Sequence, residues 1–233
     1  MRKIKIETNK YYHVYNRGAG KQDIFLDEKD YFRFLWKIHG LNNKLTSINR
    51  DYIWRKIKKE IQSQSRFEIP QIGTEISTKY LDELSQSPKL VDILCYNLLP
   101  NHYHFILKQL INDGIKIFLH KLGISYAKYF NSKYNRTGVL FERRFEAYPI
   151  NNEGKLCWLS AYVNCNWQIH KLGKAENWQF SSYRDYLALR QGKLANKKLI
   201  LNYFNNTREY KKYCETIIKE CQDFKKVKKM LMG

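Results

Sequence analysis

Two histidines separated by one residue stand in an apolar stretch, LLPNHYHFIL at positions 98–107. Side chains alternate between the two faces of a β-strand, so His102 and His104 are expected to point one way. Tyr103 and Phe105 would then point to the other face, into a core. Two neutral imidazoles on one strand face can bind one metal ion. Two polar residues at the start of a strand would give the same pattern, so the rest of the chain must decide.

A tyrosine, an asparagine and a histidine recur every four residues within the segment 156–170, whose apolar residues have helical spacing. Residues four apart share one face of a helix, so Tyr162, Asn166 and His170 would lie in a row. A half-buried tyrosine on an amphipathic helix would look the same. Together with the histidine pair, the row supplies a candidate nucleophile and candidate third metal ligands.

A large excess of positive charge points to a polyanionic partner. The chain has 233 residues, with 42 Lys and Arg against 22 Asp and Glu, and a net charge of +20. Nucleic acid is the simplest such partner. Aromatic residues make up 15% of the chain, and they can stack on unpaired bases, which favours a single-stranded substrate. A charge that serves only solubility is the alternative, and charge alone also permits RNA.

The cysteines and the hydropathy pattern indicate a cytoplasmic protein. The chain has five cysteines, an odd number, and none is arranged as Cys-x-x-Cys, which argues against a zinc finger or ribbon. Reduced thiols fit a cytoplasm. We find neither an apolar run of membrane-spanning length nor a signal-peptide core. We therefore expect a soluble protein without a membrane partner, associated with the nucleoid if it binds DNA.

The elements expected to position these residues alternate between strands and helices. Asp27 is expected to cap a helix. The expected strands are 11–18, then 91–99 continuing over 102–108 after a kink at Pro100-Asn101, and finally 139–150, strand or extended; the expected helices are 28–39, 113–131, 156–170 and 181–190. This order predicts an α+β fold with a small antiparallel sheet covered by helices.

Two segments differ from the rest in composition. Residues 41–88 are polar and charged, and we expect an insertion between core elements, with a basic amphipathic helix at 51–64. The Lys-rich tail 191–233 is expected to be helical. It is either a solvated, partly frayed helix or an arm that contacts DNA.

Several motifs taken in order resemble the single-tyrosine HUH transposases, the group that includes REP-associated tyrosine transposases and small single-tyrosine insertion-element transposases. The matching stretches lie within residues 10–40 and 90–186, and they are YHVYNRG at 12–18, LLPNHYHF at 98–105, YFN at 129–131, GVLFERRF at 138–145, YVNCN at 162–166 and WQFSSY at 178–183. The resemblance implies a ferredoxin- or RRM-like sheet of the HUH endonuclease type. It also implies that residues 1–190 form the catalytic domain, including the insertion.

The resemblance assigns roles to four residues. His102 and His104 would be the paired metal ligands, Tyr162 the nucleophile and Asn166 the third ligand, around Mg²⁺ or Mn²⁺. Members of the group often carry proline directly after that asparagine, whereas this chain has Trp167. Asn164 or His170 therefore remains an alternative third ligand. The implied activity is cleavage and rejoining of single-stranded DNA beside a hairpin, in transposition or REP-type repeat mobilisation, by a monomer or a homodimer.

The chemistry of these groups agrees with the implied activity. A tyrosine hydroxyl has a pKa of about 10 and is a poor nucleophile unless the phosphate it attacks is polarised. Attack would give a 5′-phosphotyrosine link and a free 3′-OH, a step that a second 3′-OH can reverse. Expected phosphate or hairpin contacts are basic residues of the matching stretches and the loop between them: Arg17, Lys133, Arg136, Arg143 and Arg144. These could equally be ordinary surface charges.

Three other functions remain open. The chain could be a catalytically silent protein of the same fold that binds hairpin DNA or RNA. It could process RNA, which the charge permits. A Zn²⁺ hydrolase built on His102 and His104 lacks an obvious carboxylate or cysteine ligand nearby. The prediction is geometric: the strand face carrying His102 and His104 should look at Tyr162, with Tyr103 and Phe105 buried behind it.

Overall fold

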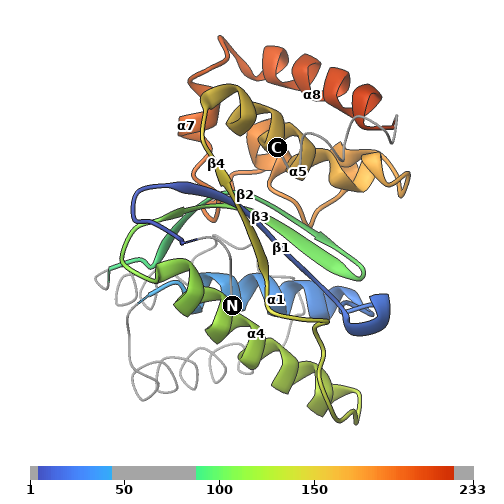
Figure 1. Cartoon of the computed structure of the whole chain (residues 1–233). Helices are drawn as coiled ribbons and strands as arrows, with labels where there is room; N and C mark the ends of the chain where they lie inside the picture. Colours follow the sequence, from blue (N-terminus) through green and yellow to red (C-terminus); the bar gives the residue numbers. More distant parts are fainter. Residues whose placement is uncertain (1–4, 44–87, 223–233) are drawn as a thin grey trace.

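A computed structural model of the chain describes residues 5–43 and 88–222 (Figure 1). The predicted helix at 51–64, most of the predicted insertion 41–88 and the end of the tail lie outside the described residues. Within the described part, helices cover both faces of a four-stranded sheet. The predicted α+β class, a small antiparallel sheet covered by helices, is confirmed.

The sheet has the strand order β2-β3-β1-β4, and all of its strand pairs are antiparallel. Its strands are β1 (Tyr11–Arg17), β2 (Val91–Leu99), β3 (His102–Gln109) and β4 (Glu146–Ile150). Helix α1 (Glu28–Leu41) connects β1 to β2, and α4 (Gly114–Lys133) connects β3 to β4. This βαββαβ order with β1 and β3 in the centre is the ferredoxin-like arrangement.

The segment expected to be one kinked strand is a hairpin, so this prediction was wrong. β2 ends at Leu99 and β3 begins at His102, and these two residues pair across the turn. Proline followed by asparagine favours a chain reversal, because proline fixes its φ angle and asparagine tolerates turn conformations. The carbonyl of Pro100 accepts hydrogen bonds from the backbone of Ile24 and Phe25, which holds the turn in place.

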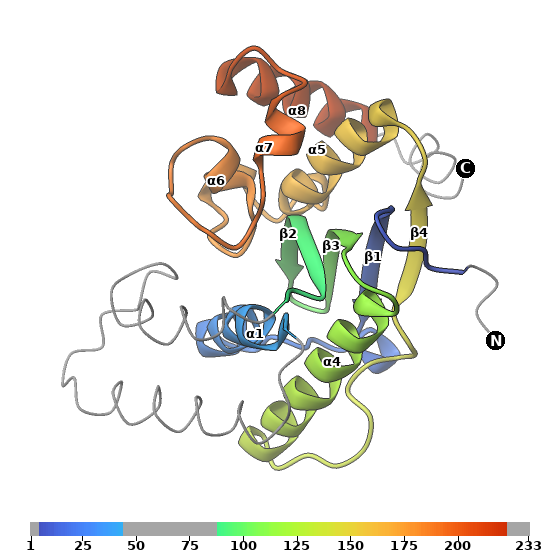
Figure 2. The ribbon, with the colours of Figure 1, turned by 90° about the vertical axis from the view of Figure 1, so that its left-hand side faces the viewer.

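One face of the sheet packs against α1 and α4 in an apolar core. Helix α1 begins as predicted at Asp27, whose side chain and that of Asp30 form a reciprocal capping box. Tyr103 and Phe105 of β3 are 2% and 0% exposed and belong to this core. Figure 2 shows α1 and α4 together on this side of the sheet.

The other face is covered by the C-terminal helices. α5 (Glu153–Ile169) lies on the sheet, and α6 (Tyr183–Tyr186), α7 (Lys198–Leu201) and α8 (Thr207–Gln222) complete this layer, with a short 3-10 turn at Ala175–Asn177 (Figure 1). A second 3-10 turn, Ala19–Lys21, follows β1. Predicted as amphipathic, α5 is instead buried on nearly every side over its middle turns. The reason is that the sheet lies under it and α8 lies over it. No described helix has the length and apolar character needed to cross a membrane.

Two other predicted elements differ from the structure. The strand expected over 139–150 is regular only in β4, and the residues before it make a single bridge between Phe141 and Gly18. The tail helix was expected to be frayed or to act as an arm. Instead, α8 buries Tyr210, Cys214 and Ile217 in the core that it shares with α5. Apolar residues on one face of α8 therefore make it part of this layer.

Candidate active site

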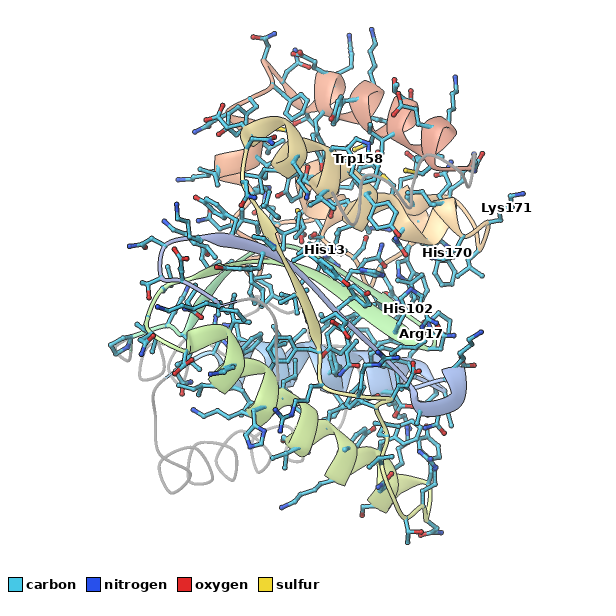
Figure 3. All side chains as sticks on the ribbon, viewed as in Figure 1. His13, Arg17, His102, Trp158, His170 and Lys171 are labelled. Carbon is cyan, nitrogen blue, oxygen red and sulfur yellow. The ribbon has the colours of Figure 1, made fainter. Side chains whose placement is uncertain are left out.

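The two histidines of β3 lie on the face of the sheet that α5 covers. In the strand register His104 stands opposite Tyr15, and His102 stands opposite Arg17. Their ring centroids are 5.1 Å apart. His104 is 7% exposed, so it is enclosed between the sheet and the helix. The pairing places both imidazoles at one end of the β1–β3 ladder, where Figure 3 shows His102 beside Arg17.

A third histidine, His13 of β1, lies directly beside His104. Its Nε2 is 2.9 Å from Nδ1 of His104, and the two rings are nearly parallel, 7° apart. One of these nitrogens must donate and the other accept, so the tautomers of the two rings depend on each other. If Nε2 of His104 keeps its lone pair for a metal ion, then Nδ1 carries the proton and donates to His13. His13 is thus an outer partner that orients a candidate ligand.

Burial keeps these imidazoles neutral. It lowers the pKa of His13 to about 4, with a smaller contribution from Lys155. Burial, with His170 and Arg17 nearby, lowers the pKa of His102 to about 3. The pKa of His104 is also well below its usual value, because of burial and the surrounding histidines. Neutral imidazole is the form that coordinates metal ions, so the electrostatics suit a ligand role.

Tyr162 of α5 faces the histidines, as predicted. The edge of its ring contacts His104 with ring centroids 6.0 Å apart, and it contacts His13 at 6.3 Å. On the opposite side its ring is stacked on Trp158, one helical turn earlier. Burial raises the pKa of the Tyr162 hydroxyl. The phenol is therefore protonated at neutral pH.

Asn166 follows Tyr162 by one turn and is fully buried, yet neither its amide nitrogen nor its amide oxygen has a hydrogen-bond partner in the described protein. Buried polar atoms almost always have partners, so an unpaired amide at this point requires a ligand or water. Among the described residues no three His, Cys, Asp or Glu side chains gather closely enough to hold a metal ion. Asn166 would offer a neutral amide oxygen as a third ligand beside the two histidines.

The two alternative third ligands, Asn164 and His170, differ in their surroundings. The Asn164 amide is already engaged, because it donates to the hydroxyl of Tyr210 and accepts from the hydroxyl of Ser182. His170 caps the C-terminal end of α5, and its ring lies 5.5 Å from that of His102. His170 therefore remains near the histidine pair, whereas Asn164 belongs to the packing of α5 on α8.

Helix α5 is tied to the sheet by a residue that the sequence did not single out. Asn97 of β2 stands opposite His104, and its side chain donates to the backbone carbonyls of Val163 and Asn164. At the far end, Trp167 stacks on Trp178 with ring centroids 3.6 Å apart. The tryptophan that replaces the common proline therefore leaves α5 helical through Ile169. Both halves of the site come from one chain.

The predicted DNA contacts fall into two groups. Arg17 lies beside His102, and its guanidinium makes no hydrogen bond or ion pair with any described residue. Arg143 and Arg144 are exposed just before β4, with Arg143 near two glutamates. Lys133 instead pairs with Asp27 and Asp30, and Arg136 donates to Gln22. The charges of Lys133 and Arg136 are thus engaged inside the protein, so we leave these two out of the DNA contacts proposed below.

Sequence patterns alone do not identify His13 as part of the site, although it is buried and in contact with His104. Every second residue of β1 from Tyr11 to Arg17 lies on one face, and alternation alone places His13 in that row. Whether that row lies on the same face of the sheet as His104 depends on how β1 pairs with β3, and no local sequence pattern specifies this pairing.

Comparison with known proteins gives little further information. No model of a known protein family matches the chain, and no curated protein matches it. One solved structure, described as "Structure of the REP associates tyrosine transposase bound to a REP hairpin", is similar over 81% of this chain and 84% of that chain. The sequence identity is 15% and the TM-score is 0.47. At these values the likeness says nothing about what this chain binds or does.

Proposed function

We propose that this chain cuts and rejoins single-stranded DNA beside a hairpin, with Tyr162 as the nucleophile and a 5′-phosphotyrosine intermediate. One observation carries the proposal: the ring of Tyr162 lies against the His13–His104 pair, one turn before the unpartnered amide of Asn166. A nucleophile, neutral nitrogen ligands and a free amide oxygen in one enclosure are the groups that metal-assisted phosphoryl transfer requires.

The candidate ligands are two neutral imidazoles and one amide oxygen, which would leave coordination positions open for a substrate oxygen. His102, His104 and Asn166 would hold Mg²⁺ or Mn²⁺, which when bound supplies positive charge to polarise the scissile phosphate. His13 holds the proton on Nδ1 of His104, so that Nε2 stays free. Arg17, whose guanidinium bonds to no other described residue, binds a neighbouring phosphate oxygen.

The transfer step balances without an outside energy source. The Tyr162 oxygen forms a bond to phosphorus, the bond from phosphorus to the 3′ oxygen breaks, and the proton lost by the phenol appears on the 3′-OH. The phosphotyrosine link keeps the energy of the broken bond, so a second 3′-OH can attack it and release Tyr162. The sequence motifs shared with single-tyrosine HUH transposases add a DNA hairpin beside the cut and a role in transposition or repeat mobilisation.

The test is formation of a covalent adduct. Single-stranded oligonucleotides that carry a hairpin and unpaired flanks, taken from the neighbourhood of the gene, are incubated with the full chain and Mn²⁺. We expect a slower-migrating protein band on a denaturing gel. Tyr162→Phe should lose the adduct and keep DNA binding, whereas Tyr203→Phe, which removes an exposed hydroxyl elsewhere, should form it normally.

Two outcomes would overturn this proposal. Binding without any adduct in the presence of Mn²⁺ would indicate a silent hairpin-binding protein. Stronger binding or cleavage of RNA than of DNA of the same sequence would indicate an RNA-processing enzyme.

A further inference from the structure

The face of the sheet that bears the histidines is only partly covered. Helix α5 contacts β2 and β3 more extensively than β4, and Figure 2 shows β4 at the edge of the sheet, next to β1. On this uncovered half stand two tyrosines, Tyr15 of β1 and Tyr148 of β4, which are each only partly buried. Half-exposed aromatic side chains on an open sheet face, next to a candidate active site, need a reason other than core packing.

The two rings are stacked and continue the row of ring contacts that begins at the histidines. They are parallel within 7°, with centroids 6.1 Å apart. Tyr148 pairs with His13, two residues from Tyr15 on β1, so the two tyrosines are diagonal neighbours on one face of the sheet. Tyr15 also contacts His104, with ring centroids 5.4 Å apart. A path of ring contacts therefore runs from Tyr148 through Tyr15 and His104 to Tyr162.

The charge beside this surface suits a phosphodiester backbone. Arg17 follows Tyr15 on the same strand face and makes no internal hydrogen bond or ion pair with a described residue. Glu146 stands opposite Tyr15, but Arg143 lies 3.8 Å from its carboxylate and reduces its repulsion of a phosphate. An aromatic surface with a free cation at its end is the arrangement that binds single strands by stacking.

We propose that Tyr15 and Tyr148 form a stacking platform for an unpaired base of the DNA strand, in the nucleotide next to the phosphate that Tyr162 attacks. This inference rests on the proposed function and adds to it the place where the strand lies. Every base has a π-face, so the platform accepts any base and reads no sequence. By binding the base of the adjacent nucleotide, the platform holds the scissile phosphate near Tyr162.

Photochemical cross-linking locates the base directly. Full-length Tyr162→Phe protein, which leaves the strand uncut, is irradiated with hairpin oligonucleotides carrying 5-iododeoxyuridine at one unpaired position at a time. We expect cross-links to Tyr15 or Tyr148 from the position beside the cleavage site, identified by peptide mass spectrometry. Cross-links that form only at other aromatic residues, such as Tyr203 or Trp178, would overturn the platform.

A cycle of substitutions tests the contact without relying on one variant. Tyr148→Leu should weaken binding of the oligonucleotide roughly tenfold, and Tyr148→Phe, which keeps the ring, should bind as the native chain does. An abasic site at the cross-linked position should weaken native binding by a similar factor and add little in Tyr148→Leu. Tyr203→Leu is the matched control and should change nothing. Full additivity of the abasic site and Tyr148→Leu would contradict the platform.

Different results would reject the platform and the proposed function. An adduct with native protein but no cross-link at Tyr15 or Tyr148 rejects the platform and leaves the nuclease in place. Cross-links at these tyrosines without any adduct support a strand-binding platform and reject cleavage. Cross-linking to an RNA strand of the same sequence but not to DNA rejects the platform as stated.

Discussion

The two faces of the sheet are built from the same strands and serve different ends. On the face toward α1 and α4, Val14, Tyr103 and Phe105 are enclosed in an apolar core. On the face toward α5, buried His13 and His104 lie in a layer that also contains unpaired amide atoms. Alternate residues of β1 and β3 thus stabilise the protein or form its candidate site.

The largest contrast is between His104 and Phe105, adjacent on β3. Phe105→Ala should lower the free energy of unfolding by about 3–5 kcal/mol, because it empties a packed core position. His104→Gln should cost less stability but reduce the cleavage rate at least about a hundredfold, because it removes a candidate ligand and the partner of His13. Urea unfolding and single-turnover cleavage measure the two quantities. If His104→Gln cuts at the native rate, this face has no catalytic role.

The second contrast lies within α5. Asn164→Ala removes two buried hydrogen bonds, one to the hydroxyl of Tyr210 and one from the hydroxyl of Ser182, and should cost about 1–3 kcal/mol of unfolding free energy. Asn166→Ala breaks no hydrogen bond among the described residues, so stability should change by less than about 1 kcal/mol. The concentration of Mn²⁺ needed for cleavage should rise at least about tenfold in Asn166→Ala only. If Asn164→Ala instead raised the Mn²⁺ concentration needed for cleavage and Asn166→Ala did not, Asn164 would be the ligand.

Lowering the pH should reduce the free energy of unfolding through groups on both faces, but in a different pH range for each face. His13 and His102 have pKa values of about 4 and about 3 in the folded chain, against about 6.5 when unfolded. The unfolded chain therefore binds more protons, and stability should fall as the pH drops below 6.5, by about 1.4 kcal/mol per pH unit for each such histidine.

Asp30, which belongs to the α1 end of the other face, gives the control. Burial raises the pKa of this carboxyl, but Lys133, Tyr134 and backbone hydrogen bonds outweigh that effect and lower it. Its contribution should be lost only below the usual range of a carboxyl pKa, as the pH falls toward the folded value. Urea unfolding at pH 7, 6 and 5 should therefore show a decline that His102→Gln reduces. Equal slopes for the two proteins would mean that His102 takes up protons freely when folded.

The smallest contrast compares two cations. Arg17→Gln should weaken binding of single-stranded DNA a few-fold and lower the slope of log affinity against log salt by about 0.7, the value for one phosphate contact. Lys133→Gln should leave that slope unchanged and instead lower stability by about 1–3 kcal/mol, because the buried carboxylate of Asp30 loses its ion pair with Lys133. A lower salt slope in Lys133→Gln would return this residue to the DNA contacts.

Local signals predicted much of the fold and one side of the site. The cap at Asp27, the strand face of His102 and His104, and the helix carrying Tyr162 and Asn166 all follow from spacing and residue type. The contact of His13 with His104 spans 91 positions and depends on strand pairing, which no local pattern encodes. The separation of Asn166 from Asn164 arises only when α8 packs on α5 and engages one of the two amides. Both features depend on contacts between segments far apart in the sequence, which local patterns do not predict.

The most direct test of the central claim is to find which tyrosine carries the DNA. The chain has 18 tyrosines. Among the described residues both Tyr15 and Tyr162 contact His13 and His104, and Tyr162 is the one that does so from the facing helix. The adduct formed with Mn²⁺ is digested with a protease and a nuclease, and the modified peptide is sequenced by mass spectrometry. The account predicts a 5′-linked nucleotide on Tyr162 and on no other residue. A nucleotide linked to any other tyrosine would contradict it.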